Sequence, residues 1–419
     1  MSVARLQLPF GPSLVGVQMP AALLLGVLTP RESARAFDDH VLLREALAHP
    51  IGTPRLRDLA QPGHKVVIVT SDLTRPCPSD RLLPFVLDEL TAAGVPDVDV
   101  TIVVALGLHR RMSTSELEAA VGADVYRRVR VINHDPTDTV RLGVTSAGTP
   151  VEIFRPVVEA NLRVCLGNLE FHYFAGYSGG AKAILPGCAS EATVSANHRL
   201  MMRPEATAGR LEGNPVRADI EEGGALVGVD FILNVLVDSH RRIVGAVAGD
   251  VTAAHRRGCE IAAYRGVVPI PKRADVVLVS AGGYPQDVNL YQAQRALDNA
   301  SHAVRPGGII VLVAKCSEGL GNRTFETWMR EASSPDQVLD RIQQEFVFGG
   351  HKAAAIASVL KQASVFLVSA LPVESVQCCG MVPFDDLGEA MEAALAAAGR
   401  AADVIVMPCG DSILPVVNR

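Results

Sequence analysis

Long hydrophobic runs are absent from this sequence of 419 residues. The longest apolar run that we find, Ala21 to Leu28, is far shorter than the roughly 20 residues that a membrane-spanning helix needs. The N-terminus also lacks the charged segment and apolar core of a secretory signal. No basic run exceeds a few residues and the formal net charge is -6, which argues against nucleic acid as the main partner. We therefore expect a cytoplasmic protein that binds neither membranes nor nucleic acid.

Paired cysteine spacings are missing as well. The cysteines are scattered along the chain without a C-x-x-C motif, so the sequence indicates neither a disulfide framework nor a cysteine-rich zinc site. This usage is typical of a reducing compartment, where most cysteines serve as small buried apolar residues. Internal repeats and low-complexity tracts are absent too, and the composition is that of an ordinary globular protein.

Several continuous apolar runs predict a fold of the α/β class. Such runs, rich in β-branched residues, are typical of parallel strands covered on both faces. Because the chain is longer than one core usually supports, we expect two α/β, Rossmann-like domains with the active site in the cleft between them. The predicted strands are Leu6–Phe10, His64–Val69, Val98–Leu106 and Leu162–Leu166, followed by Asp275–Ser280, Gly308–Ala314, Ser364–Ser369 and Asp403–Met407.

A basic connector that contains prolines, Pro269–Arg273, marks the predicted domain boundary. We expect an N-terminal cofactor-binding domain over residues 1–270 and a C-terminal domain over 274–407. The tail, 408–419, could rejoin the first domain. Residues 1–60 show no recognisable chemistry. The predicted helices are Arg31–Ala48, Ser79–Ala93, Tyr291–Ala303 and Leu387–Ala402.

Polar, reactive residues follow three of the predicted strands in the first domain. Asp72 and Arg75 follow the first of these strands, His109 follows the second, and His172 and Lys182 follow the third. In open α/β sheets, ligands bind beyond the carboxyl ends of the strands. We therefore expect these five side chains to meet at one site.

The densest group of candidate residues lies between Asn168 and Arg199. Its glycines at 176, 179 and 180 let the backbone approach an anion, but the spacing is not that of a Walker loop. Lys182 could hold a phosphate, form a covalent adduct or only extend along the surface. His198 is a possible metal ligand, although one histidine is weak evidence for a metal. From the residues alone, we infer an α/β enzyme that binds an anion and has two or three histidines at its site.

Four ordered motifs resemble the nickel-pincer lactate racemase family. They read SDLTRP at 71–76, GLHR at 107–110, HYFAGYSGGAKAILPG at 172–187 with NH at 197–198, and GYPQDVNLYQAQRAL at 283–297. The resemblance implies a nickel-pincer nucleotide, which is a pyridinium mononucleotide that holds nickel through sulfur and carbon. It also implies a covalent link from Lys182 to this cofactor, with His198 as the remaining nickel ligand. Such a donor set suits square-planar nickel.

The resemblance further implies a racemase or epimerase of 2-hydroxy acids, with His109 and His172 as the acid/base pair. Removing the hydroxyl proton while hydride leaves for the cofactor gives a 2-oxo acid with a neutral ketone group, whereas removing the α-proton would build a dianion. Arg75 would hold the substrate carboxylate, and Asp72 would orient Arg75 or the cofactor. The other implied contacts are Tyr291, Gln292, Arg295 and His351 for the substrate, and Thr70, Ser71, Asp72, Gly176, Ser178, Gly179 and Gly180 for the nucleotide.

Two departures from the family pattern concern the substrate. Arg295 stands where the lactate racemases carry lysine, and His351, followed by Lys352, stands near the position of an apolar aromatic residue. Because a planar guanidinium binds differently from a point charge, we expect a substrate larger or more polar than lactate.

Other functions remain open at this stage. One is a sugar-acid 2-epimerase, and another is a non-catalytic carrier of the nickel-pincer nucleotide, which the presence of both His109 and His172 disfavours. A phosphotransferase is disfavoured by the missing Walker spacing. The expected partners are a small 2-hydroxy acid, the enzymes that assemble the cofactor, and a second copy of the chain in a possible homodimer.

Overall fold

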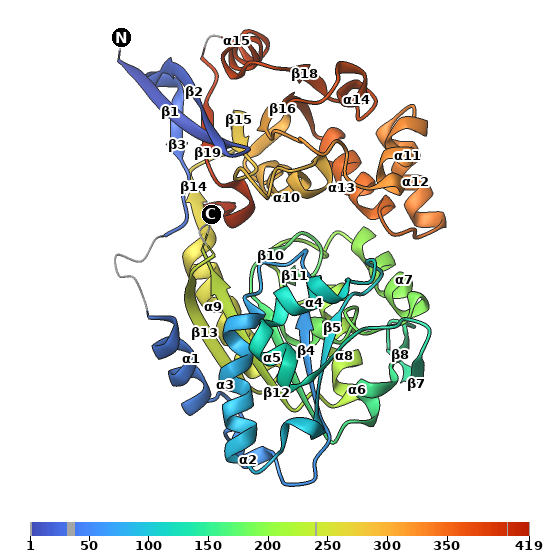
Figure 1. The fold of residues 1–419 in the computed structure, drawn as a ribbon. Helices are drawn as coiled ribbons and strands as arrows, with labels where there is room; N and C mark the ends of the chain where they lie inside the picture. Colours follow the sequence, from blue (N-terminus) through green and yellow to red (C-terminus); the bar gives the residue numbers. More distant parts are fainter. Residues whose placement is uncertain (1, 32–37, 239–240, 400, 419) are drawn as a thin grey trace. The chain divides into compact units, whose positions relative to one another are not determined.

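The computed structural model describes residues 2–31, 38–238, 241–399 and 401–418 (Figure 1). The chain forms two compact units, each with its own sheet. Unit 1 comprises Met1–Glu32 together with Arg265–Arg419, and unit 2 comprises Ser33–Tyr264. The predicted α/β class with two sheet-bearing domains is confirmed.

Unit 2 is built on a six-stranded sheet in the order β13-β12-β9-β4-β5-β6. All neighbouring strands are parallel except β12 and β13, which are antiparallel. The strands are β4 (Val66–Ser71), β5 (Val100–Ala105), β6 (Arg130–Asn133), β9 (Leu162–Asn168), β12 (Phe231–Val237) and β13 (Ile243–Gly249). Two small hairpins accompany the sheet, β7 (Thr139–Val144) with β8 (Pro150–Phe154), and β10 (Phe171–His172) with β11 (Gly176–Tyr177).

Helices cover both faces of this sheet. The central strand β4 shows why, because Val66 and Ile68 belong to one buried core and Val67 and Val69 belong to another. A strand buried on both sides has no polar face, as its apolar run predicted. The helices of unit 2 are α1 (Asp39–Ala48), α2 (Leu56–Leu59), α3 (Ser79–Ala92), α4 (Thr114–Val121), α5 (Ala123–Arg128), α6 (Arg155–Glu159), α7 (Glu191–Arg199), α8 (Pro215–Val227) and α9 (Ala253–Gly266), with the 3-10 turns η2 (Asp97–Asp99), η3 (Gly180–Ala183) and η4 (Leu200–Met202).

Helix α3 illustrates how the sequence defines these elements. Its buried residues include Leu82, Leu83, Val86 and Leu90, which recur at helical spacing and pack on the sheet. The helix ends where Gly94 takes a φ of +79°, a conformation that suits glycine and stops a helix.

Unit 1 has a parallel sheet in the order β18-β17-β16-β15-β19-β3. Its strands are β3 (Leu24–Val27), β15 (Ala274–Ser280), β16 (Val304–Val313), β17 (Ala363–Val368), β18 (Val382–Phe384) and β19 (Val404–Met407), with the pairs β1 (Val3–Phe10) and β2 (Ser13–Pro20), and β14 (Val267–Ile270) and β20 (Leu414–Val417). Its helices are α10 (Leu290–Ser301), α11 (Arg323–Glu331), α12 (Pro335–Gln344), α13 (Gly350–Leu360), α14 (Val373–Gln377) and α15 (Leu387–Ala398), with the 3-10 turns η1 (Ala21–Leu23) and η5 (Gly410–Ser412).

Both ends of the chain differ from the predicted domain boundaries. Residues 1–32, predicted to lie in the first domain, belong to unit 1, where β3 pairs with β19 and Leu8 and Val17 enter the core. The tail also lies in unit 1, because β20 pairs with β14. Of the helix predicted over Arg31–Ala48, Asp39–Ala48 is observed as α1 and residues 32–37 lie outside the described residues.

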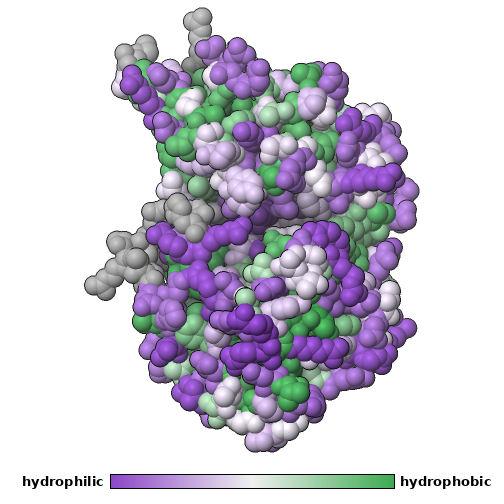
Figure 2. Space-filling view, in the orientation of Figure 1, coloured by the Kyte–Doolittle hydropathy of each residue, from purple (hydrophilic) through white to green (hydrophobic). Residues whose placement is uncertain are grey.

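Hydrophilic and hydrophobic residues are interspersed on the face of the molecule drawn in Figure 2. Among the residues described here, no helix combines the length and the hydropathy that crossing a membrane requires.

Candidate active site

The candidate residues of unit 2 follow three neighbouring strands. Strand β4 lies between β9 and β5, and all three are parallel, so their carboxyl ends share one edge of the sheet. The chain runs from β4 to β5 on one side and later returns to β9 on the other side. This reversal of strand order is where open α/β sheets bind their ligands. Asp72 follows β4, His109 follows β5, and Glu170 and His172 follow β9.

Asp72 and His109 form a hydrogen-bonded pair at this edge. The Nδ1 atom of His109 lies 2.5 Å from Oδ2 of Asp72, whose other oxygen accepts from the backbone N–H and the hydroxyl of Thr74. Burial alone would raise the pKa of Asp72, but the hydrogen bond and charge of His109, together with Thr74 and Arg75, hold the pKa below its usual value. Asp72 is therefore an ionised carboxylate that fixes the ring of His109.

Arg75 forms an ion pair with Glu170, whereas we expected Asp72 to orient either Arg75 or the cofactor. Its Nη1 atom lies 3.7 Å from Oε1 of Glu170, while Asp72 bonds His109. The side chains of Arg75 and Glu170 both keep some exposure. A pair this long and this hydrated holds the guanidinium only loosely, so Arg75 can also bind an incoming carboxylate.

The loop from Phe171 to Lys182 needs its glycines for contacts within the protein. Gly176, Gly179 and Gly180 all have positive φ. A side chain on Gly176 would overlap the carbonyl oxygen of Arg210, and a Cβ on Gly179 would lie 2.6 Å from Oδ1 of Asn234. Tight packing thus accounts for these glycines without a bound anion.

Two of the hydroxyl groups predicted near the nucleotide bond to protein atoms. The hydroxyl of Thr70 lies 2.6 Å from that of Ser79 at the start of α3, and Thr70 is fully buried. Ser178 donates to the carbonyl of Asn168 and accepts from the backbone N–H of Glu170. These contacts fix the strand ends. Ser71, which was also predicted to lie near the nucleotide, is half-buried.

Lys182 and His198 share one electrostatic environment. Lys182 lies in η3 with some exposure to solvent, yet its dense surroundings lower its pKa well below the usual range, helped by the charges of Arg75 and Arg217 and opposed by Glu170. Burial, followed by the charge of Lys182, lowers the pKa of His198 to about 3. The site thus favours a neutral amine and a neutral imidazole, which are the nucleophilic and metal-binding forms.

Helix α7 carries His198 toward this group of residues. Ser190 caps the helix by accepting from the N–H of Thr193. Asn197, next to His198, donates to the buried carboxylate of Asp219 on α8. Within the described part of the chain, no cluster of three or more histidine, cysteine or acidic residues is arranged to hold a metal ion.

His172 is held by its own loop. Its Nδ1 atom accepts from the backbone N–H of Ala175 at 3.3 Å, and the residue is 7% exposed. The ring of Phe174 lies between two imidazoles, with its centroid 4.5 Å from that of His172 and 5.0 Å from that of His198. His172 in the loop and His198 on α7 therefore belong to the same packed cluster.

The remaining predicted residues lie in unit 1, on α10 and α13. Tyr291, Gln292 and Arg295 lie in the first turns of α10, which Asn289 caps by accepting from the N–H of Gln292. His351 lies in the first turn of α13 and packs edge-on against Tyr291, with ring centroids 6.2 Å apart. The adjacent Lys352 donates to Oε1 of Gln294 at 2.6 Å and has its Nζ atom 5.5 Å from the Tyr291 ring centroid.

This unit also contains an unusual carboxyl group. Burial raises the pKa of Asp298 to about 7, and the charge of Lys352 acts in the opposite direction. Asp298 is on α10, one turn beyond Gln294, so the α10–α13 contact combines two aromatic or heteroaromatic rings with a cation and a titratable acid.

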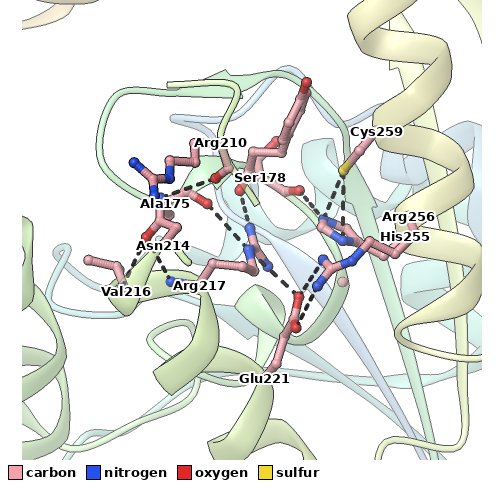
Figure 3. Close-up of polar contacts among 12 residues, drawn as sticks. Ala175, Ser178, Arg210, Asn214, Val216, Arg217, Glu221, His255, Arg256 and Cys259 are labelled. Atoms are coloured by element: carbon pink, nitrogen blue, oxygen red, sulfur yellow. Dashed lines mark hydrogen bonds and ion pairs between the residues drawn. The ribbon is translucent and has the colours of Figure 1, made fainter. Parts of the chain in front are cut away.

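Several residues at the unit 2 site escaped sequence reasoning. Glu170 lies in the segment between Asn168 and Arg199, and its charge, two residues before His172, could have marked it as a candidate. Asn214, Arg217, Asn234 and His255 are far away in sequence and belong to no motif, yet they bond the backbone of the 171–182 loop. Only the fold brings them together, and Figure 3 shows three of them, Asn214, Arg217 and His255.

Models of known protein families match both parts of the chain. Residues 10–209 match the lactate racemase N-terminal domain, and residues 270–415 match the lactate racemase C-terminal domain. The chain is 34% identical to a lactate racemase of Thermoanaerobacterium thermosaccharolyticum and 32% identical to one of Lactiplantibacillus plantarum. The first alignment covers 98% of this chain and 99% of the relative, and the second covers 98% and 100%.

Solved structures give the same result. The lactate racemase apoprotein of T. thermosaccharolyticum superposes with a TM-score of 0.92 at 35% identity, covering 99% of this chain and 100% of that one. A Thermotoga maritima protein, with a TM-score of 0.66 at 19% identity over 88% of this chain and 100% of its own, shares the fold. Full-length similarity to proteins of one isomerase family, with both of its domains present in order, shows that this chain belongs to the lactate racemase family.

Proposed function

We propose that this protein is a nickel-dependent racemase or epimerase of 2-hydroxy acids that are larger or more polar than lactate. The observation that carries the proposal is the pair of histidines, His109 and His172, which follow the two strands on either side of β4 and are held through Nδ1 in opposite ways. The proposal also draws on the family, whose racemases interconvert two enantiomers.

His109 is arranged to take a proton. Its Nδ1–H donates to the ionised Asp72, so in the neutral ring Nε2 carries the lone pair. The carboxylate stabilises the imidazolium that forms when Nε2 accepts the hydroxyl proton of a 2-hydroxy acid. Asp72 thus acts through His109, a role that differs from the expected orientation of Arg75 or the cofactor.

His172 presents the opposite group to the site. Because its Nδ1 atom accepts from the N–H of Ala175, the neutral ring carries its proton on Nε2. In the two neutral rings, Nε2 of His109 is therefore an acceptor and Nε2 of His172 is a donor. To give a proton to the oxygen of the 2-oxo acid, His172 must first take up a second proton at Nδ1, so that the acid is the imidazolium and the neutral ring is left behind.

The chemistry of the donor set fits the nickel-pincer nucleotide. We propose Lys182 for its covalent attachment and His198 as its protein ligand to nickel, since the site favours the neutral forms of both. We propose the 171–182 loop and Ser71 as the groups that hold the nucleotide phosphate. When bound, this group would supply a reversible acceptor for the C2 hydrogen and its electron pair.

Substrate binding is proposed for Arg75 in unit 2 and for α10 and α13 in unit 1. Arg75 binds the carboxylate, because its pairing with Glu170 is loose. Tyr291, Gln292 and Arg295 supply further contacts, and His351 shapes the pocket for the remaining part of the substrate. Arg295, His351 and Lys352 add polar groups to this part of unit 1, where His351 and Lys352 are buried, and such groups favour a substrate with a second acidic group or with hydroxyls.

Two other functions are tested by the same experiment. A sugar-acid 2-epimerase would invert one of several stereocentres, and the polar α10–α13 residues also suit such a substrate. A non-catalytic carrier of the nickel-pincer nucleotide would need Lys182 and His198 but would have no use for an Asp72–His109 pair.

The test is to produce the protein together with cofactor-assembly enzymes and to measure intact mass, nickel content and turnover. We expect a mass increment on Lys182, about one nickel per chain, and racemisation of an enantiopure dicarboxylic or polyhydroxy 2-hydroxy acid faster than of lactate. Lys182→Ala should lose the increment, whereas His109→Gln should keep the increment and nickel but lose turnover. A loaded wild type that turns over none of the acids, with His109→Gln indistinguishable from it, would favour the carrier.

A further inference from the structure

Backbone carbonyls of the 171–182 loop are held by side chains from two helices. The loop has little regular structure, since β10 and β11 are two residues each. Asn214 donates to the carbonyl of Phe174 at 2.9 Å, and Arg217 donates to the carbonyls of Ala175 and Tyr177. His255 on α9 lies 2.9 Å, through Nε2, from the carbonyl of Ser178. Figure 3 shows these side chains converging on the loop from α8 and α9.

Burying the guanidinium of Arg217 beneath this loop is energetically unfavourable. It is 1% exposed, and burial lowers its pKa to about 10, although Glu221 raises it. Glu221 lies 4.0 Å from Arg217 and is bonded through both oxygens to Arg256, at 2.7 and 2.9 Å. Among the described residues, Nη1 of Arg217 also lacks a hydrogen-bond partner. A buried cation that is so incompletely paired is weak support for stability alone, which points to a role in function.

The contact of Arg217 leads directly to a proposed catalytic group. Arg217 Nε donates to the carbonyl of Ala175 at 3.2 Å, and the N–H of the same residue donates to Nδ1 of His172. The N–H of Ala175 shares its peptide group with the carbonyl of Phe174, which Asn214 holds, and Arg217 holds the next carbonyl, so the two side chains together fix the backbone that directs this N–H at the imidazole. On the other side of the loop, Asn234 accepts from the N–H of Gly180, two residues before Lys182. The loop is thus fixed between the residue that would move a proton and the residue that would hold the cofactor.

We propose that Arg217 is a positioning residue: by holding Ala175 and Tyr177, it sets the ring orientation and tautomer of His172. The assignment rests on the proposed role of His172 as an acid/base group, and Arg217 itself contacts neither substrate nor cofactor. Asn214 and His255 complete the support of the loop.

The test compares Arg217→Met with Arg163→Met in protein without cofactor. Arg163 is a matched control, because it also donates to backbone carbonyls, those of Val157 and Val158, at the opposite end of β9. The readout is the long-range ¹H–¹⁵N spectrum of protein labelled at histidine, with the His172 signals assigned from a His172→Gln variant. Because no substrate or turnover is needed, the result does not depend on the proposed reaction.

We expect the wild type and Arg163→Met to show His172 with its proton on Nε2. In Arg217→Met, the His172 signals should move to the shifts of mixed tautomers. Arg217→Lys, which keeps the charge and can reach one carbonyl, should fall between the two, and it provides the measurement if Arg217→Met does not fold. In loaded protein, Arg217→Lys should lower kcat by about 10-fold to 100-fold with a smaller change in KM. His172 signals unchanged in a folded Arg217 variant would overturn the proposal, whatever the protein's activity.

Discussion

The hydrogen-bond partner of each histidine determines whether its free ring nitrogen is a donor or an acceptor. His109 and His172 have the same side chain, but a carboxylate holds Nδ1 of one and a backbone N–H holds Nδ1 of the other. The partner of Nδ1 determines which nitrogen of a neutral ring carries the proton. Opposite starting states therefore follow from two hydrogen bonds.

Replacing Asp72 tests this dependence. Asp72→Asn can present an amide N–H to His109 and stabilise the wrong tautomer, so we expect kcat of loaded protein to fall by about 10²-fold to 10⁴-fold. Asp135→Asn is the matched control, because Asp135 bonds the N–H and hydroxyl of Thr137 just as Asp72 bonds those of Thr74. Both substitutions weaken the bonds to a threonine two residues later, but only Asp72→Asn alters a histidine contact. Comparing kcat of the two variants therefore separates these effects. Equal effects of the two substitutions would contradict the assigned role.

Asp72 should also affect how the free energy of unfolding depends on pH. Its folded-state pKa is lowered, so its contribution is fully present above the ordinary aspartate pKa of about 4 and is lost as pH falls through the lower folded-state value. In urea unfolding, the difference in free energy between wild type and Asp72→Asn should shrink on acidification below about pH 4. A difference that stays constant from neutral pH into that range would show that the charge on Asp72 is not involved.

Sequence patterns could place these residues but not pair them. Strand ends brought Asp72, His109 and His172 to one edge, because parallel strands share their direction. Nothing in the spacing distinguishes Arg75 from His109 as the partner of Asp72, since both are cationic or become so and both follow neighbouring strands. Arg217 and His255 were not predicted, because helical residues that bond a distant loop carry no local signal.

At the scale of elements, the 171–182 loop depends on close approach. Gly176 has a φ of +77° and would collide with the carbonyl of Arg210 if it carried a side chain. Gly148, in the turn between β7 and β8, has a φ of +86° with open space around it. The two positions share the backbone conformation and differ in the surrounding packing.

This pair allows a matched prediction. Gly148→Ala should cost about 1 kcal/mol from the backbone conformation alone, whereas Gly176→Ala should cost roughly 1–3 kcal/mol more and displace the loop. Chemical denaturation gives the two free energies of unfolding, and intact mass after loading shows whether Lys182 is still modified. Similar stabilities and full loading of both variants would mean that the loop packs more loosely than described.

The elements that the sequence predicted are those whose runs were continuous. Strands β4, β5 and β9, and β15 to β17 with β19, are apolar through most of their length and matched their predicted ranges closely. Strand β12 is interrupted by Asn234, which turns to bond Gly180, and β6 is only four residues long. Because the polar Asn234 breaks the apolar run of β12, the sequence pattern did not predict this strand.

On the scale of the whole molecule, the chain order and the structural units do not coincide. The N-terminal 32 residues complete the sheet of unit 1, and the C-terminal strand β20 pairs with β14 in the same unit. Such pairing between distant segments depends on register and on sheet edges, which local periodicity does not encode. The class of the fold was accessible from the sequence because it depends only on the alternation of apolar strands and helices.

Full-length similarity to lactate racemases, at 34% identity, extends over both units. The residues that we assign to proton transfer and to the cofactor lie in unit 2, whereas the departures at Arg295 and His351 lie in unit 1. This division supports a common reaction with an altered substrate.

The most direct test of the account is to racemise an enantiopure 2-hydroxy acid, with ordinary hydrogen at C2, in heavy water with cofactor-loaded protein. If His109 and His172 move only the hydroxyl proton, the C2 hydrogen never enters the solvent, and mass spectrometry of the product should find it retained. Deuterium at C2 of the first product formed would show that a residue removes the α-proton, which would contradict the roles assigned here.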